Sequence, residues 1–194
     1  METDKLDKKG QNMKLLIASD IHGDAECCQA MLDAFKSENA EKILILGDIL
    51  YHGPRNDLPS GYAPKKVIEM LNAVAEKLIC VRGNCEAEVD QMVLNFPVMS
   101  TTACVLDTEN NRSIYMSHGH VYSPDNLPPM PEGSVFLSGH THVLMAEKRT
   151  GILCVNPGSV SLPKNGNPKT YAVYDGESIE IKAFTGEIVI KTNL

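Results

Sequence analysis

The sequence of 194 residues contains no tryptophan, and aromatic residues make up only 5% of it. It also has no stretch that approaches the roughly 18 to 20 consecutive apolar residues required for a membrane-spanning helix. The opening segment METDKLDKKGQN lacks the apolar core of a secretory signal. These absences predict a soluble, cytoplasmic protein in which residues 1–12 form a flexible polar leader.

Positive charge is scarce as well. Lysine and arginine total 18 against 25 aspartates and glutamates, which gives a formal net charge of -7. Proteins that bind long nucleic acids or anionic membranes use lysine and arginine to neutralise phosphates. The composition therefore predicts neither of these partners. A small phosphate ligand is still compatible with it, provided that a metal ion supplies positive charge locally.

The six cysteines do not show the spacing of a disulfide framework or of a structural zinc site. Cys27 and Cys28 are adjacent, whereas Cys80, Cys104 and Cys154 fall inside apolar runs typical of strands. We therefore expect these residues to be reduced thiols in the core.

The content of 43% apolar residues in a chain of this length is enough for one core, so a single domain over residues 13–194 is expected. Short apolar runs that each end in a polar loop alternate with segments of helical periodicity. This alternation predicts a βαβαβ unit whose loops gather at one edge of a parallel sheet. The predicted strands are 14–19, 43–46 and 78–81, and the predicted helices are 25–37 and 64–76.

Beyond residue 102 the pattern changes to short strands separated by turns. Together with the first unit, these strands predict an α/β fold: a single-domain αββα sandwich of two mixed β-sheets flanked by helices. The expected strands are 102–107, 113–117, 134–138, 143–148, 151–155, 170–175, 178–184 and 187–192.

Histidine placement is the most informative feature, because all six histidines lie in polar segments beside predicted strand ends and none is expected in the core. The motifs Asp-x-His, Gly-Asp, Gly-Asn, His-Gly-His and Gly-His-x-His each follow an apolar strand. Carboxylate, amide and imidazole groups suit hard and borderline divalent ions, and clustered thiolates are absent. This donor set predicts a two-metal hydrolase in which one carboxylate, Asp48, bridges ions about 3.5 to 4 Å apart. The histidines are His22, His52, His118, His120, His140 and His142.

The order of these motifs resembles that of the calcineurin-like metallophosphoesterases, over nearly the whole chain after Met13. The motifs are DIHG at 20–23, GD at 47–48, GN at 83–84, SHGH at 117–120 and GHTH at 139–142. Three longer segments resemble small bacterial phosphodiesterases of the YfcE type. These segments are GDILYHGPRND, GNCE and NPGSVSLPKNG, the last at 156–166.

The resemblance implies a metallophosphoesterase domain over residues 13–194. It implies an ion held by Asp20, His22 and His142, a second held by Asn84, His118 and His140, and Asp48 shared between them. The expected reaction is hydrolysis of a small phosphodiester by in-line attack of a hydroxide that bridges the ions, with Asp48 and Asn84 among the catalytic residues. Manganese is the expected ion, with zinc, nickel, cobalt, iron or magnesium as alternatives.

Cys85 departs from the wider superfamily, in which a histidine often follows the Gly-Asn pair. The leaving group would then receive its proton from His52, His120 or a metal-bound water. Cys85 itself is either a tolerated small residue or a redox-sensitive thiol. His52 and Arg55 either contact phosphate oxygens or stabilise their loop through hydrogen bonds, and His120 either supports a metal ligand or donates to the phosphate.

Two other functions remain open. The substrate could be a phosphomonoester or a phosphoprotein. Alternatively, the protein could be a non-catalytic interaction scaffold, like the retromer subunit that shares this small fold but has a degraded metal site. Every ligand position of the motif set is occupied here, which favours the enzyme. A homo-oligomer is compatible with the sequence.

Overall fold

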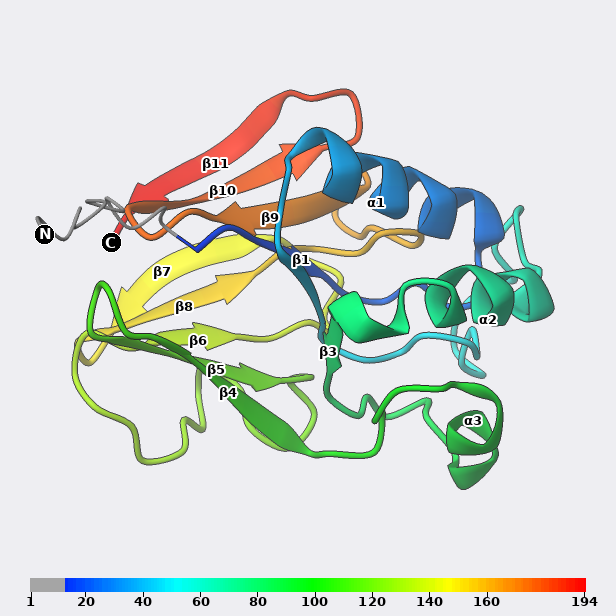
Figure 1. Ribbon diagram of the computed structural model, residues 1–194, viewed down its shortest axis with the longest axis horizontal. Coiled ribbons are helices and arrows are strands. Elements are labelled where there is room, and N and C mark those ends of the chain that lie inside the picture. The colour runs from blue at the N-terminus through cyan, green and yellow to red at the C-terminus, as the bar shows by residue number, and fades with distance from the viewer. Residues whose placement is uncertain (1–12) are drawn as a thin grey trace, which may run out of the picture.

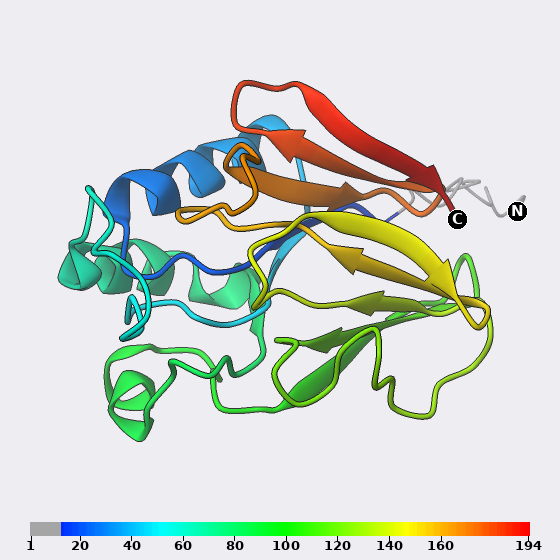
Figure 2. The same cartoon turned by 180° about the vertical axis from the view of Figure 1, so that it is seen from behind.

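The structure, a computed structural model, describes residues 13–194, so the predicted leader 1–12 lies outside the described residues. Two β-sheets pack face to face, as Figures 1 and 2 show from opposite sides. The first sheet has the strand order β11-β10-β9-β1-β2-β3 and the second has the order β4-β5-β6-β8-β7. Each contains parallel and antiparallel pairs, so the predicted sandwich of two mixed sheets is confirmed. The strands are β1 Leu15–Ala18, β2 Lys42–Ile45, β3 Leu78–Cys80, β4 Thr102–Asp107, β5 Arg112–Ser117, β6 Val135–Leu137, β7 Met145–Arg149, β8 Ile152–Asn156, β9 Thr170–Tyr174, β10 Ser178–Ala183 and β11 Ile188–Asn193.

The parallel strands β1, β2 and β3 are connected by two helices, as the βαβαβ pattern predicts. Helix α1, Ala25–Ser37, begins where the Asp24 side chain accepts a hydrogen bond from the Cys27 N–H at 3.0 Å, an N-cap readable from the sequence. Helix α2, Pro64–Asn72, is shorter than predicted, because the chain leaves the helix at Ala73 and makes a 3₁₀ turn over Ala75–Lys77 before β3. No helix of residues 13–194 combines the length and apolar character needed to cross a membrane.

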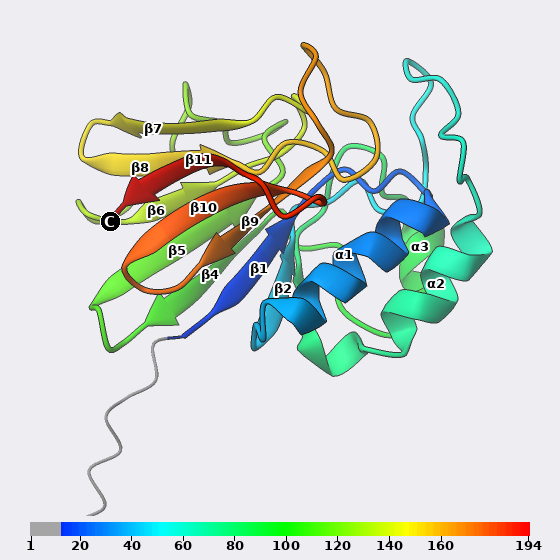
Figure 3. The same cartoon turned by 90° about the horizontal axis from the view of Figure 1, so that it is seen from above.

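Strand β1 lies at the centre of the molecule and is buried on both faces. Leu15 and Ile17 point into the layer between the two sheets, whereas Leu16 and Ala18 point toward the helices. Alternate residues of a strand face opposite sides of the sheet. Because both faces of this sheet are covered, every residue of the strand is buried, and the strand is a continuous apolar run. Figure 3 shows α1 and α2 along the outer face of this sheet.

The outer face of the second sheet is covered differently. Phe136, Ile152 and Cys154 form a small apolar cluster there, against which Tyr122 and Leu127 pack from the loop after β5. A loop therefore takes the place that a helix occupies on the first sheet. A short helix that the sequence analysis missed, α3 Glu88–Val93, lies instead beside the loop that follows β3.

The cysteines are all free thiols, as expected, but one prediction about them is wrong. Cys27, Cys28, Cys80 and Cys154 are buried, whereas Cys104 is exposed. Its strand, β4, forms the edge of the second sheet, and its outward-facing side chains meet solvent. The local sequence alone does not show that a strand lies at the edge of a sheet, so it does not show which of its side chains are exposed.

Glu38, just after α1, provides a test of stability against pH. Its carboxylate accepts hydrogen bonds from Lys182 at 2.9 Å, Lys14 at 3.0 Å and the Tyr171 hydroxyl at 3.1 Å. Burial opposes the charged form, but the two lysines outweigh it and lower the pKa of Glu38 below its ordinary value. A carboxyl with a lowered pKa stabilises the fold above its unfolded-state pKa, and this contribution is lost as the pH falls through the folded-state pKa.

We therefore expect Glu38→Gln to lower the free energy of unfolding by about 1 kcal/mol at pH 7, because the cluster is partly open to solvent. The difference from wild type should shrink below about pH 4, where the wild-type carboxyl also becomes neutral. Urea unfolding in the presence of a chelator measures both effects. Glu69→Gln, an exposed glutamate of α2, is the matched control. A deficit that stays constant from pH 7 to pH 3 would contradict the electrostatic explanation.

Candidate metal centre

The predicted ligands come from loops that follow parallel strands of both sheets. Asp20 and His22 follow β1, Asp48 follows β2 and Asn84 follows β3. In the second sheet, the remaining ligands follow β5 and β6. Carboxyl ends of parallel strands share one edge, so these loops converge at one end of the sandwich. The ligands from the second sheet are His118, His140 and His142.

The backbone is unusual at most of these positions. Positive φ angles are uncommon for residues other than glycine and cost roughly 1 to 3 kcal/mol each. Five of the predicted ligands nevertheless have φ between 50° and 67°. Backbone strain concentrated in one region indicates a functional site, because the surrounding structure must stabilise the strained conformations. The five residues are Asp20, His22, Asp48, His140 and His142.

Three of the histidines are fully buried, so the expectation that none would lie in the core is wrong. Each is held by a hydrogen bond from its Nδ1 to a backbone carbonyl, which fixes the ring and leaves Nε2 as the free nitrogen. This arrangement satisfies the buried ring and aims its lone pair into the site. The pairs are His22 with Tyr51 O at 2.7 Å, His118 with Leu46 O at 2.6 Å and His142 with Leu162 O at 2.6 Å.

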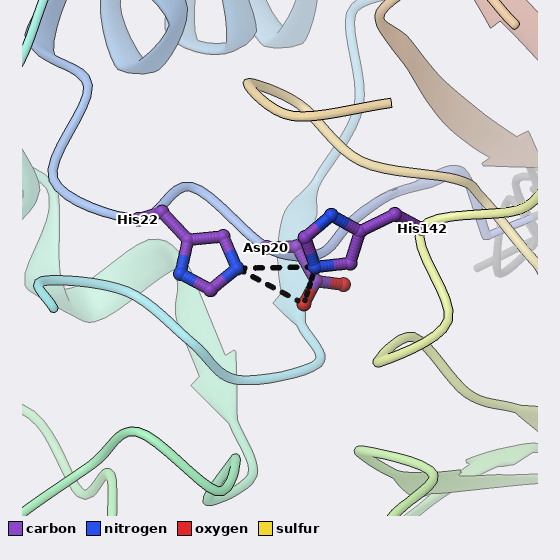
Figure 4. Close-up of side chains that lie close together, drawn as sticks. All are labelled: Asp20, His22 and His142. Carbon is purple, nitrogen blue, oxygen red and sulfur yellow. Dashed lines mark hydrogen bonds and ion pairs between the residues drawn. The ribbon is translucent and has the colours of Figure 1, made fainter. Parts of the chain in front are cut away.

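The first donor cluster combines Asp20, His22 and His142 (Figure 4). Asp20 Oδ1 lies 3.1 Å from His142 Nε2 and 3.5 Å from His22 Nε2, and the two Nε2 atoms are 3.1 Å apart. Oδ1 is buried and has no hydrogen-bond donor among residues 13–194. The other oxygen, Oδ2, accepts from the Ser19 hydroxyl and the His140 N–H. Three buried acceptors that face one another fit a cation.

A second donor cluster lies beside the first and contains Asp20, Asp48 and His118. His118 Nε2 lies 3.1 Å from Asn84 Oδ1 and 3.4 Å from Asp48 Oδ2. Asp48 Oδ2 is also 3.8 Å from His22 Nε2, so this oxygen lies between the two clusters. Its partner Oδ1 accepts from the Cys85 N–H at 2.9 Å, which orients the carboxylate. This geometry fits the predicted bridging role.

The electrostatics of the site match its donor set. Burial would raise the pKa values of Asp20 and Asp48, but the neighbouring histidines hold both below their usual range. Burial likewise opposes a charged His118 ring, yet the two carboxylates raise its pKa to about 9. The two carboxylates thus favour the protonated ring of His118 in the metal-free site, and metal binding would displace that proton, because a coordinating imidazole is neutral. Burial and His118 lower the pKa of His140, whose ring centre lies 5.1 Å from that of His118.

Glu86 is a site residue that the sequence analysis did not identify. Its buried carboxylate accepts backbone N–H groups of Ile49 at 2.7 Å, Asp48 at 2.9 Å and Gly83 at 2.5 Å. It thus ties the loop after β2 to the loop after β3. Burial and the Asp48 charge raise the pKa of Glu86, whereas the three donors favour its ionised form. Its motif, GNCE, was visible in the sequence, but nothing there shows that this glutamate points inward.

At two glycines, neighbouring atoms lie so close to the backbone that no side chain would fit. A Cβ on Gly83 would lie 2.1 Å from Asp48 Oδ1, and one on Gly139 would lie 1.8 Å from Ser19 Oγ and 2.7 Å from Asp20 Oδ2. Neither loop could take these positions with a side chain present. Both glycines therefore allow the loops to come within reach of the carboxylates.

The other predicted catalytic residues differ in position. Cys85 and Arg55 line a cavity of about 330 Å³ beside the clusters. His120 is exposed and does not line this cavity, and its ring centre lies 5.3 Å from that of His118. The His52 ring instead lies edge-on to the rings of Tyr51 and Tyr62 and does not line the cavity. Its predicted role in leaving-group protonation stays a prediction without geometric support.

Cys85 lines the cavity beside Asp48 and, with His22 and Asp48, forms a further group of potential donors. In the metal-free site, burial and the Asp48 carboxylate raise the pKa of its thiol, which favours the neutral form. A neutral thiol lacks the charge of an imidazolium ion and is a weak general acid. Protonation of the leaving group by this side chain is therefore disfavoured.

The comparisons with known proteins agree with this geometry. The family model described as the calcineurin-like phosphoesterase superfamily domain matches residues 13–178. Phosphodiesterase YfcE of Escherichia coli strain K12 is 48% identical over 178 residues, which cover 92% of this chain and 96% of that protein. A solved structure of YfcE from E. coli, described as a phosphoesterase, superposes with a TM-score of 0.90 at 46% identity, covering 93% of this chain and 99% of that one.

A more distant structure, zinc-bound Vps29 of Entamoeba histolytica, has a TM-score of 0.60 at 18% identity, covering 93% of this chain and 99% of that one. At this identity the likeness shows the fold alone. The family and the two donor clusters together imply that divalent metal ions bind at the end of the sandwich. With the family model covering most of its length and nearly half of its aligned residues shared with YfcE, the chain belongs to the calcineurin-like phosphoesterase superfamily.

Proposed function

We propose that this protein is a metal-dependent phosphodiesterase that hydrolyses a small phosphodiester. The observation that carries the proposal is the position of Asp48 Oδ2 between two donor clusters, each supplied with a fixed histidine Nε2. Similarity to a protein named as a phosphodiesterase supports the choice of a diester. A pair of divalent ions would act as Lewis acids on the phosphoryl group and activate water for attack.

The residues of the chain have distinct tasks in this proposal. Asp48 holds the two clusters together, and the carbonyl-bound rings of His22, His118 and His142 keep their nitrogens aimed into the site. Asn84, an exposed side chain at the mouth of the site, offers its amide oxygen toward His118. Because the Cys85 thiol is a weak acid, substrates whose leaving groups need no protonation should react fastest.

Manganese is the proposed ion, because oxygen and nitrogen donors predominate, but zinc, nickel, cobalt, iron and magnesium share these ligand preferences. The absence of long nucleic acids and membranes as partners, the homo-oligomer and the cytoplasmic location remain predictions. A non-catalytic scaffold role, like that considered for the retromer subunit, is not favoured by any specific contact among residues 13–194. Both donor clusters are intact, which favours the enzyme.

The test is a metal add-back assay. Protein stripped of metal should not hydrolyse bis(p-nitrophenyl) phosphate, and manganese should restore turnover more fully than zinc, nickel, cobalt or magnesium. The similarity to a protein named as a phosphodiesterase leads us to expect that kcat/KM for the diester exceeds that for p-nitrophenyl phosphate by at least about tenfold. Absence of turnover of both esters with every ion would refute the proposed function, and a preference for the monoester would assign it to the phosphomonoesterases.

A further inference from the structure

The cavity beside the metal centre has two positively charged side chains on its rim, Arg55 and Lys164. They come from different loops, 51–61 and 157–169, which rise at the same end of the molecule (Figure 3). The floor of the cavity is formed by predicted metal ligands. Its volume of about 330 Å³ is enough for a ligand larger than a single phosphate. The ligands that line it are Asp48, Asn84, His140 and His142.

Both loops are anchored to the site. Lys164 donates its backbone N–H to the carbonyl of His142 at 3.1 Å, and the His142 ring donates to the Leu162 carbonyl at 2.6 Å. Left-handed turns at Asn165 and Gly166, with φ of 58° and 73°, then reverse the chain. The backbone of the lysine is therefore held in a fixed position relative to a metal ligand.

The arginine loop is held in a similar way. The Asn56 side chain donates to the His52 carbonyl at 2.7 Å and closes a tight turn around Arg55. Gly53 passes so near Cys85 that a Cβ there would lie 3.2 Å from Sγ. Arg55 thus emerges from a loop packed directly against the site.

Neither cation is neutralised by a neighbour. Arg55 and Lys164 are exposed and form no ion pair with any of residues 13–194, and Asp48 is the one acidic side chain among the residues that line the cavity. Two unpaired cations that face a substrate cavity are available for a ligand.

The charges around the cavity indicate what such a ligand would carry. The carboxylates of the site, Asp20, Asp48 and Glu86, lie at the metal ligands, where divalent ions would offset their charge. Arg55 and Lys164 then remain as two positive charges without a counterpart. A second phosphate group on the substrate would balance them.

We propose that Arg55 and Lys164 bind a second phosphate group of the substrate, so that the preferred substrate is a phosphodiester that also carries a phosphate beyond the scissile one. This proposal rests on the proposed function, because it assumes that the diester binds at the metal centre. It develops one of the two sequence-based alternatives for Arg55, contact of the guanidinium with phosphate oxygens, by assigning that contact to a second phosphate. The other alternative was hydrogen bonds that stabilise the loop. Diesters with a neutral or cationic remote group, such as choline, should be poorer substrates.

A matched substrate pair tests the proposal. The p-nitrophenyl ester of thymidine 5′-monophosphate and its 3′-phosphorylated form share the scissile bond and the leaving group and differ by one phosphate. We expect kcat/KM of the manganese-loaded enzyme to be at least about tenfold higher for the phosphorylated form. p-Nitrophenyl phosphorylcholine should be the slowest of the three. Calorimetry should show thymidine 3′,5′-bisphosphate binding at least about tenfold more tightly than thymidine 5′-monophosphate.

The variants Arg55→Gln and Lys164→Gln should each reduce the preference ratio, and the double variant should abolish it, in both turnover and calorimetry. Lys65→Gln, which removes an exposed charge from α2, should leave the ratio unchanged. Equal rates for the matched pair in the wild type, or proportional losses with both substrates in the variants, would overturn the second-phosphate site alone. Absence of turnover with these three esters and with bis(p-nitrophenyl) phosphate would instead refute the proposed function, and with it this inference.

Discussion

Replacing Asp48 with asparagine is expected to lower kcat for bis(p-nitrophenyl) phosphate by roughly 10³-fold or more and to leave the protein with fewer metal equivalents. Asp48 Oδ2 lies between the two donor clusters, 3.4 Å from His118 Nε2 and 3.8 Å from His22 Nε2. Asparagine preserves the shape of the side chain but removes the charge that holds two cations close together. The first cluster, Asp20 with His22 and His142, remains intact in this variant.

Elemental analysis after gel filtration measures the metal content, and p-nitrophenol release measures the rate. Asp57→Asn is the matched control, because this aspartate lies exposed in the loop after β2 and does not line the cavity. It should retain both the activity and the metal. A variant at position 48 that keeps two metal ions and wild-type turnover would disprove the bridging role.

The second large effect is expected at Glu86. Glu86→Ala leaves three buried backbone N–H groups, those of Ile49, Asp48 and Gly83, without their acceptor. A buried donor without a partner costs about 1 to 3 kcal/mol, so we expect the free energy of unfolding to fall by roughly 3 to 5 kcal/mol. Because the same carboxylate connects the loops that carry Asp48 and Asn84, metal affinity should also fall about 10- to 100-fold.

Glu86→Gln separates the two consequences. Glutamine keeps one acceptor oxygen, but its amide group turns a donor toward a backbone N–H, so a smaller loss of about 2 kcal/mol is expected. Urea unfolding with a chelator gives the stability, and a manganese titration of the folded protein gives the affinity. Glu88→Gln, an exposed glutamate two residues along, should change neither strongly. Unaltered metal affinity in a folded Glu86→Gln variant would show that the carboxylate does not position the ligands.

Much of the fold was predictable because local pattern and tertiary environment agree. The helix predicted over 25–37 matches α1, since Asp24 caps it and its apolar residues recur at helical spacing. Strands β1 and β2 are continuous apolar runs because both faces of their sheet are covered. Secondary structure was predicted less accurately where contacts with neighbouring segments determine where an element begins or ends. Helix α2 ends early, and α3 is too short and too exposed to show an apolar stripe.

The convergence of the predicted ligands was also predictable from their order, because each chemical motif follows a strand whose carboxyl end must lie at a shared edge. The sequence could not show how the ligands are held. The buried rings of His22, His118 and His142 depend on backbone carbonyls 20 to 72 residues away in the chain. Such contacts exist only after the loops converge, which is also why Glu86 and Lys164 were missed.

The sequence by itself determined which atoms are available: carboxylate, amide and imidazole donors after strands, in an order shared with one superfamily. Tertiary structure alone decided that Asp20 Oδ1 and two imidazole nitrogens face one another in a buried space. It also decided that Arg55 and Lys164 share a cavity although 109 positions separate them. The physical reason is that donor type is a local property of a residue, whereas burial, orientation and charge balance depend on segments that meet only when the two sheets pack together.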